Sequence, residues 1–132
     1  MGAELRRTIV TDITSGKGMT TPPPHERHVR VLLSPLIQDG IEDFAVGFTE
    51  VPPFIAGTRH HHKNGSEIWL LYSGNGLARV GEEEFHVSAG SVVYTPAGTE
   101  HQFVNNTSEP VRLYFLYVPS GEEKAVIDGE FR

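Results

Sequence analysis

The sequence predicts an all-β domain folded as a sandwich or barrel. Short runs rich in Val, Ile, Leu, Phe and Tyr recur along the chain, and clusters of Gly, Pro, Asn, Asp and Glu separate them. This alternation is typical of many short strands joined by turns. No stretch of a dozen residues repeats apolar side chains with a helical period, so β-α-β units and the nucleotide sites they carry are not expected.

The chain divides into three segments. Residues 1–26 are polar and end in a run of three prolines, which predicts an extended N-terminal arm. Residues 27–118 hold the strand-like runs and form the predicted barrel. Residues 119–132 are mostly polar, and we expect a loose C-terminal tail or a dimer contact there. The expected strands span residues 27–33, 43–51, 67–73, 77–80, 84–88, 91–95, 101–105 and 111–118.

Length and composition exclude several classes of protein and of binding site. A chain of 132 residues suits one domain, and the absence of cysteine excludes disulfides and thiolate metal sites. The net charge of -6 comes from dispersed acidic residues without a basic stripe, which argues against nucleic acid as a partner. No apolar run approaches the roughly 20 residues of a membrane span, and the N-terminus does not read as a signal peptide. We therefore expect a cytoplasmic protein with no membrane partner.

The positions of the histidines give the first indication of a metal site. Alternate residues of a strand share a face, so His60 and His62 point the same way while His61 points away. The same alternation puts Glu67 and Trp69 on one face of an otherwise apolar strand. A glutamate facing a core is costly unless it is paired, and metal ligation would compensate that cost.

Two segments resemble the two sequence motifs of the cupin family. Residues 57–74, GTRHHHKNGSEIWLLYSG, resemble the first motif, and residues 90–105, GSVVYTPAGTEHQFVN, resemble the second. The matching positions are His60, His62, Glu67 and Gly74 in the first motif, and Gly90, Pro96, Gly98, His101 and Asn105 in the second.

The resemblance implies a double-stranded β-helix, which is a jelly-roll barrel of six to eight strands with a metal ion inside its mouth. It also implies that His60, His62, Glu67 and His101 hold that ion. One position departs from the pattern, because the first motif usually opens with glycine where this chain has Phe54. We expect the turn that enters this segment to differ.

Three imidazoles and one carboxylate suit one divalent transition metal ion, namely Fe, Mn, Ni, Zn, Co or Cu, rather than Ca or Mg. The ligand set leaves the choice among these metals open. An octahedral ion would keep two open positions for water, dioxygen or a chelating substrate. Its residual positive charge would favour a small anionic or chelating metabolite.

Trp69 and Phe103 follow Glu67 and His101 by two residues, so they lie on the faces that carry the ligands. We interpret them as substrate-binding residues, with simple core packing as the alternative. The catalytic residues stay unassigned. The acid, base or anion-binding candidates among which the sequence does not choose are Tyr72, Tyr94, Tyr114, Tyr117, Arg59 and Arg112.

Metal-binding cupins include dioxygenases, isomerases, decarboxylases, lyases and binding modules, so fold and metal do not fix the reaction. We favour a metal-dependent enzyme with dioxygenase-type chemistry over an isomerase or lyase. The chain is also similar to cupin lyases of sulfonium carboxylates, but those have tyrosine where this chain has Trp69. The alternative is a non-catalytic module that binds or senses a sugar or other metabolite.

We expect a homodimer, because small cupin barrels pair through segments such as 27–33 and two-fold dimers are common.

Overall fold

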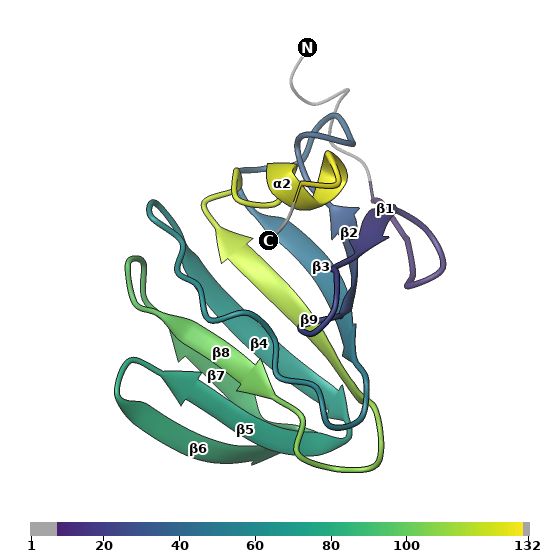
Figure 1. Ribbon diagram of the computed structural model, residues 1–132. Helices are drawn as coiled ribbons and strands as arrows, with labels where there is room; N and C mark the ends of the chain where they lie inside the picture. The colour runs from purple at the N-terminus through teal and green to yellow at the C-terminus, as the bar shows by residue number, and fades with distance from the viewer. Residues whose placement is uncertain (1–7, 131–132) are drawn as a thin grey trace.

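The computed structural model describes residues 8–130, and it confirms the all-β prediction (Figure 1). Each of the eight expected runs forms a strand, and β1 is an additional strand within the predicted arm. Residues 1–7 of that arm and the last two residues of the predicted tail lie outside the described part of the chain. The described elements are β1 (Lys17–Thr20), β2 (His28–Leu33), β3 (Ala45–Val51), β4 (Ser66–Ser73), β5 (Asn75–Val80), β6 (Glu83–Ser88), β7 (Val92–Thr95), β8 (His101–Val104), β9 (Val111–Val118) and α2 (Lys124–Ile127).

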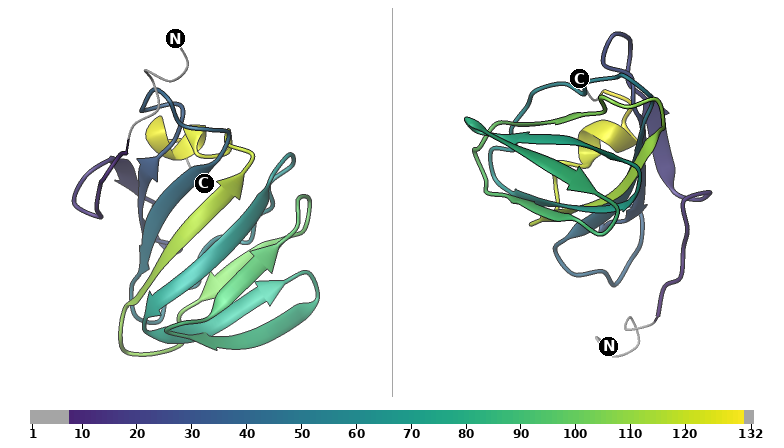
Figure 2. Two further views of the ribbon diagram at one scale, coloured as in Figure 1. Left: turned by 180° about the vertical axis from the view of Figure 1, so that it is seen from behind. Right: turned by 90° about the horizontal axis from the view of Figure 1, so that it is seen from below.

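The strands form two antiparallel sheets. The larger sheet has the order β1-β2-β3-β9-β4-β7, and the smaller has the order β6-β5-β8. Strand β9 lies between β3 and β4, so the larger sheet joins segments that are far apart in sequence. The two sheets curve around a common interior, which is seen along its length in one view and end-on in the other (Figure 2).

The barrel interior is filled by alternate residues of the strands. In β9, the residues at every second position from Val111 to Tyr117 are buried, and those between them are partly exposed. Gly47 of β3 lies opposite Phe115 of β9, and a Cβ atom on Gly47 would lie 2.0 Å from the Phe115 ring. Glycine at position 47 therefore leaves room for the tip of this aromatic ring.

The segments flanking the barrel contribute to the fold. Strand β1 pairs with β2 from Lys17 opposite Val31 to Thr20 opposite His28. The one-turn helix α2 packs against β1 and β2 at one end of the barrel (Figure 1). No helix within residues 8–130 is long and apolar enough to cross a membrane.

The turn before the histidine segment has an unusual backbone conformation. Phe54 has a φ angle of 57°, which is the left-handed region that favours glycine, and its side chain is 70% exposed. The residue type thus departs from the family motif, while the backbone adopts a conformation that glycine takes readily.

Candidate metal centre

Four potential ligands meet at one end of the barrel. Glu67 lies near the start of β4, and His101 is the first residue of β8. His60 is placed by two backbone hydrogen bonds with His101, of 3.0 and 2.7 Å. One ligand atom from each of these residues and from His62 lies within 4.8 Å of the other three, and His61 is exposed as expected. The structure therefore brings together all four residues of the predicted ligand set.

Backbone carbonyls fix the orientation of two imidazole rings. Nδ1 of His60 donates to the Thr58 carbonyl at 2.7 Å, and Nδ1 of His101 donates to the Thr99 carbonyl at 3.0 Å. Because a carbonyl can only accept, both rings carry their proton on Nδ1 and offer Nε2 as the ligand atom. This is the arrangement that second-sphere hydrogen bonds impose on metal-binding histidines.

The carboxylate of Glu67 lies at the centre of the cluster. Its Oε1 atom is 2.7 Å from Nε2 of His101 and 2.9 Å from Nε2 of His62, and its Oε2 atom accepts a 2.8 Å hydrogen bond from Nε1 of Trp69. Burial alone would raise the pKa of Glu67, but its contacts with His101 and His62 outweigh that effect and hold the pKa at about 2. Glu67 is therefore an ionised ligand at neutral pH.

The cluster passes two tests for holding a cation. Nε2 of His101 is buried and, among the described residues, has no aligned hydrogen-bond partner although Glu67 is close. A cation between these atoms would satisfy both, and opposite ligands about 2.1 Å from an ion are about 4.2 Å apart, close to the spread observed here. Burial and the neighbouring His101 also lower the pKa of His60 to about 4, so its ring is neutral, as metal ligation requires.

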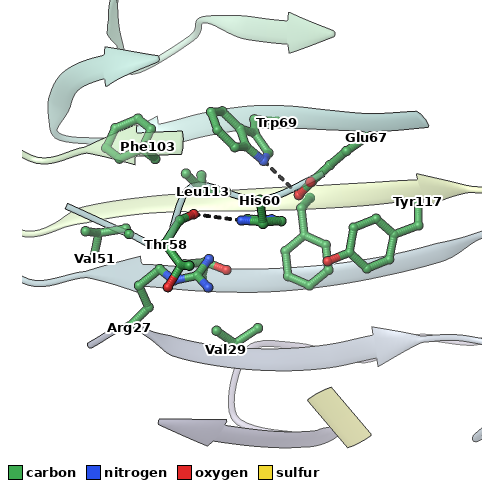
Figure 3. A pocket seen from close by; sticks show the side chains of 13 residues that line it. Arg27, Val29, Val51, Thr58, His60, Glu67, Trp69, Phe103, Leu113 and Tyr117 are labelled. Carbon is green, nitrogen blue, oxygen red and sulfur yellow. Dashed lines mark hydrogen bonds between the residues drawn. The ribbon is translucent and has the colours of Figure 1, made fainter. Parts of the chain in front are cut away.

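A small cavity adjoins the cluster, and both predicted pocket residues line it. Trp69 and Phe103 pack edge to face with ring centroids 5.8 Å apart, and His60 and Glu67 form another part of the wall (Figure 3). The space open to water is about 20 Å³, which holds one or two water molecules. A ligand larger than a few atoms requires these side chains to move.

Two residues near the site carry no recognisable sequence signal. Arg27 precedes β2 and lines the cavity, and Oε2 of Glu122 lies 3.6 Å from Nδ1 of His62. Both are outside the two motifs, and their positions depend on how the arm and the tail fold back onto the barrel. An isolated charged residue in a polar segment gives no local indication of such a contact.

Of the unassigned acid, base and anion-binding candidates, Tyr117 lines the cavity. Burial raises the pKa of Tyr117 well above its usual value, so the phenol keeps its proton and can act as a hydrogen-bond donor. The other candidates do not line this cavity. Tyr72 and Tyr114 contact each other, Tyr94 is exposed, Arg59 pairs with Glu100, and Arg112 pairs with Glu50.

Comparison with known proteins finds a family match over most of the barrel strands. The family model described as "Cupin domain" matches residues 47–117. The Uncharacterized protein MJ1618 of Methanocaldococcus jannaschii is 28% identical over 102 residues, which cover 76% of this chain and 81% of that protein.

Solved structures show the same fold. A protein of Thermotoga maritima described as a predicted oxalate decarboxylase superposes with a TM-score of 0.71 at 16% identity, covering 85% of this chain and all of that chain. KdgF from Halomonas sp. superposes with a TM-score of 0.65 at 18% identity, covering 80% of this chain and 92% of that chain. At these identities the likeness concerns the fold alone, and it confirms the predicted double-stranded β-helix.

Proposed function

Because the chain belongs to the cupin domain family, we propose that it is a metal-dependent enzyme acting on a small anionic or chelating metabolite. The observation that carries this proposal is the convergence of three imidazoles and an ionised Glu67 beside a cavity. A divalent ion held by His60, His62, Glu67 and His101 would polarise substrate oxygens and activate dioxygen or a water molecule.

The residues of the chain have distinct parts in this proposal. The carbonyls of Thr58 and Thr99 hold the proton on Nδ1 of His60 and His101, so that Nε2 faces the ion. Trp69 holds one oxygen of Glu67, and with Phe103 it forms an apolar part of the cavity wall.

We favour oxygen-dependent cleavage with Fe or Mn over isomerisation or lysis. An octahedral ion held by these four residues would keep two positions open, which is enough for a substrate oxygen and dioxygen together. Trp69 stands where the similar lyases have tyrosine, and this difference counts against the lyase alternative. The cytoplasmic location and the homodimer expected from the sequence remain predictions.

The test begins with elemental analysis of the native protein. Metal-free protein is then loaded separately with Fe(II), Mn(II) or Zn(II), and dioxygen uptake is measured over a panel of carboxylates, diketones and catechols. We expect uptake with Fe or Mn, and loss of that uptake in the H62A variant. Tight metabolite binding without uptake or conversion by any metal form would instead favour the non-catalytic binding or sensing module.

A further inference from the structure

Residues 119–130 follow β9 at the end of the barrel that carries the ligands. In the antiparallel pair of β4 and β9, Glu67 lies opposite Tyr117, so the chain leaves β9 beside a ligand. Gly65 lies against the next turn, because a Cβ atom on it would be 3.3 Å from the carbonyl oxygen of Pro119. The C-terminal segment is therefore built next to the histidine segment.

The main chain is held on both sides of Glu122. On its N-terminal side, the backbone N–H and Oγ of Ser120 donate to Oδ1 of Asp43, at 3.0 and 2.5 Å. On its C-terminal side, Glu123 is fully buried, and its Oε2 atom accepts a 2.5 Å hydrogen bond from Oγ of Ser34. These two anchors fix the backbone position of Glu122.

The carboxylate of Glu122 faces the outer nitrogen of a metal ligand. Its Oε2 atom lies 3.6 Å from Nδ1 of His62, while Nε2 of the same ring lies 2.9 Å from Oε1 of Glu67. The ring thus points Nε2 into the cluster and Nδ1 toward Glu122. The gap to Glu122 exceeds a hydrogen-bond distance by roughly 0.4–0.9 Å, which a small movement of one side chain would close.

Metal ligation gives Nδ1 of His62 a proton to donate. A neutral imidazole carries one proton, so a ring that binds an ion through Nε2 carries that proton on Nδ1. In His60 and His101, backbone carbonyls accept the corresponding proton. At His62, the described part of the chain places the carboxylate of Glu122 on this side of the ring.

We propose that Glu122 is a positioning residue that accepts the Nδ1 proton of His62 when the cluster holds its ion. It acts through His62, because a carboxylate on Nδ1 orients the ring and makes Nε2 a more basic ligand. Its negative charge also offsets the residual positive charge of a divalent ion held by one carboxylate. This inference rests on the proposed metal-dependent function, and it adds to the metal centre a residue from outside both family motifs.

The test compares variants of the full chain. E122A removes the acceptor, E122Q keeps an acceptor oxygen without the charge, and the control E130A removes an exposed glutamate of the same segment outside the cluster. Cobalt(II) affinity is measured by competition with a chromophoric chelator, and circular dichroism checks the fold. Proton NMR of the cobalt-loaded proteins follows the Nδ1 protons of His60, His62 and His101, which the paramagnetic ion shifts away from the other signals.

We expect E122A to weaken cobalt binding roughly 10- to 100-fold, as the loss of an outer-sphere partner does. E122Q should lie between the parent and E122A, because a neutral amide is a weaker acceptor than a carboxylate. In E122A, one of the three shifted N–H signals should exchange faster with solvent, while the two from rings bonded to carbonyls stay unchanged. E130A should match the parent in both measurements.

The same measurements can overturn the inference. A parent-like cobalt affinity in E122A, or unchanged exchange of all three N–H signals, would remove Glu122 from the metal centre while leaving the metal function intact. Faster exchange of all three signals would also count against it, because a general loosening of the barrel end would then explain the weaker binding. A parent protein that takes up no cobalt would overturn both proposals. If E122A does not fold, a parent-like affinity in E122Q would count against the carboxylate.

Discussion

The three imidazoles of the cluster are each held on the side away from Glu67. His60 and His101 donate to backbone carbonyls, and His62 faces the carboxylate of Glu122 at 3.6 Å. Two of these partners are main-chain carbonyls, so substitution of the Thr58 or Thr99 side chain leaves the accepting atom in the chain. Within residues 8–130, Nδ1 of His62 faces a side chain from outside both motifs, so its orientation is sensitive to the C-terminal segment.

We predict that H62A abolishes stoichiometric metal binding. The substitution removes a ligand nitrogen and leaves Glu67 with one fewer close partner. The matched control is H86A, because His86 is exposed in β6 and lies outside the cluster. Elemental analysis after loading should show one metal per chain in the parent and in H86A. Full occupancy in H62A would contradict the ligand assignment.

The hydrogen bond from Trp69 to Glu67 gives a second prediction. W69F keeps an aromatic ring in the wall but removes the N–H that binds Oε2 of Glu67. We expect the metal affinity to fall by about tenfold, the lower end of what loss of an outer-sphere partner costs. Competition with a chromophoric chelator measures this change, and F103L serves as the control because Phe103 contacts no ligand oxygen. An unchanged affinity in W69F would show that the indole only packs.

At the scale of the elements, the sequence predicted the strands that show a local apolar alternation. It missed the features whose position depends on other parts of the fold. Alternation and turn residues marked the eight barrel strands, and they placed His60 and His62 on one side. Strand β1 has the sequence KGMT, without an apolar alternation, and it is extended because it pairs with β2. Arg27 could not be recognised either, because its place in the cavity wall depends on how the turn closed by the Thr21–Arg27 hydrogen bond packs onto the barrel.

The turn at Phe54 provides a prediction about stability. A left-handed conformation costs a residue with a Cβ atom roughly 1–2 kcal/mol, and glycine avoids that cost but loses about 0.5–1 kcal/mol through the greater freedom of the unfolded chain. Phe54 is 70% exposed, so little burial is lost on truncation. We expect F54G to raise the free energy of unfolding by about 0.5–1 kcal/mol in urea denaturation. F54A, which keeps the Cβ atom, should give no gain, and an equal gain in both variants would refute the strain argument.

For the whole molecule, the buried cluster makes the stability of the metal-free protein depend on pH. His60 has a pKa of about 4 in the folded protein against an ordinary value of 6.5. As the pH falls, the imidazole is therefore protonated in the unfolded chain before it is protonated in the folded one. Stability is therefore complete above about pH 6.5 and decreases as the pH falls toward 4. Glu67, with a pKa of about 2 against 4.5, extends the loss below pH 4.5.

The His60 contribution to this pH dependence can be isolated. When the pH falls from about 7.5 to about 5, protonation of His60 in the unfolded chain should lower the free energy of unfolding by about 2 kcal/mol. Urea denaturation of the metal-free protein at the two pH values measures the change, and H60Q should lose that part of the difference. A difference of the same size in H60Q and the parent would exclude His60 as its source.

The assembly of the molecule is the last prediction. The sequence suggested a homodimer formed through segment 27–33, but β2 lies between β1 and β3 and has no open edge along its paired residues. If chains pair by strand addition near this segment, the partner would add to β1, which is the edge strand next to β2. Light scattering over a concentration series should then give about twice the chain mass of 14.6 kDa at micromolar concentration. T20P is the matched variant: Thr21 N donates to the Arg27 carbonyl, so by alternation the Thr20 N–H points to the open edge of β1, and proline removes that donor. A parent protein that stays monomeric would refute the dimer, and a dimer equally stable in T20P would place the interface elsewhere on the barrel.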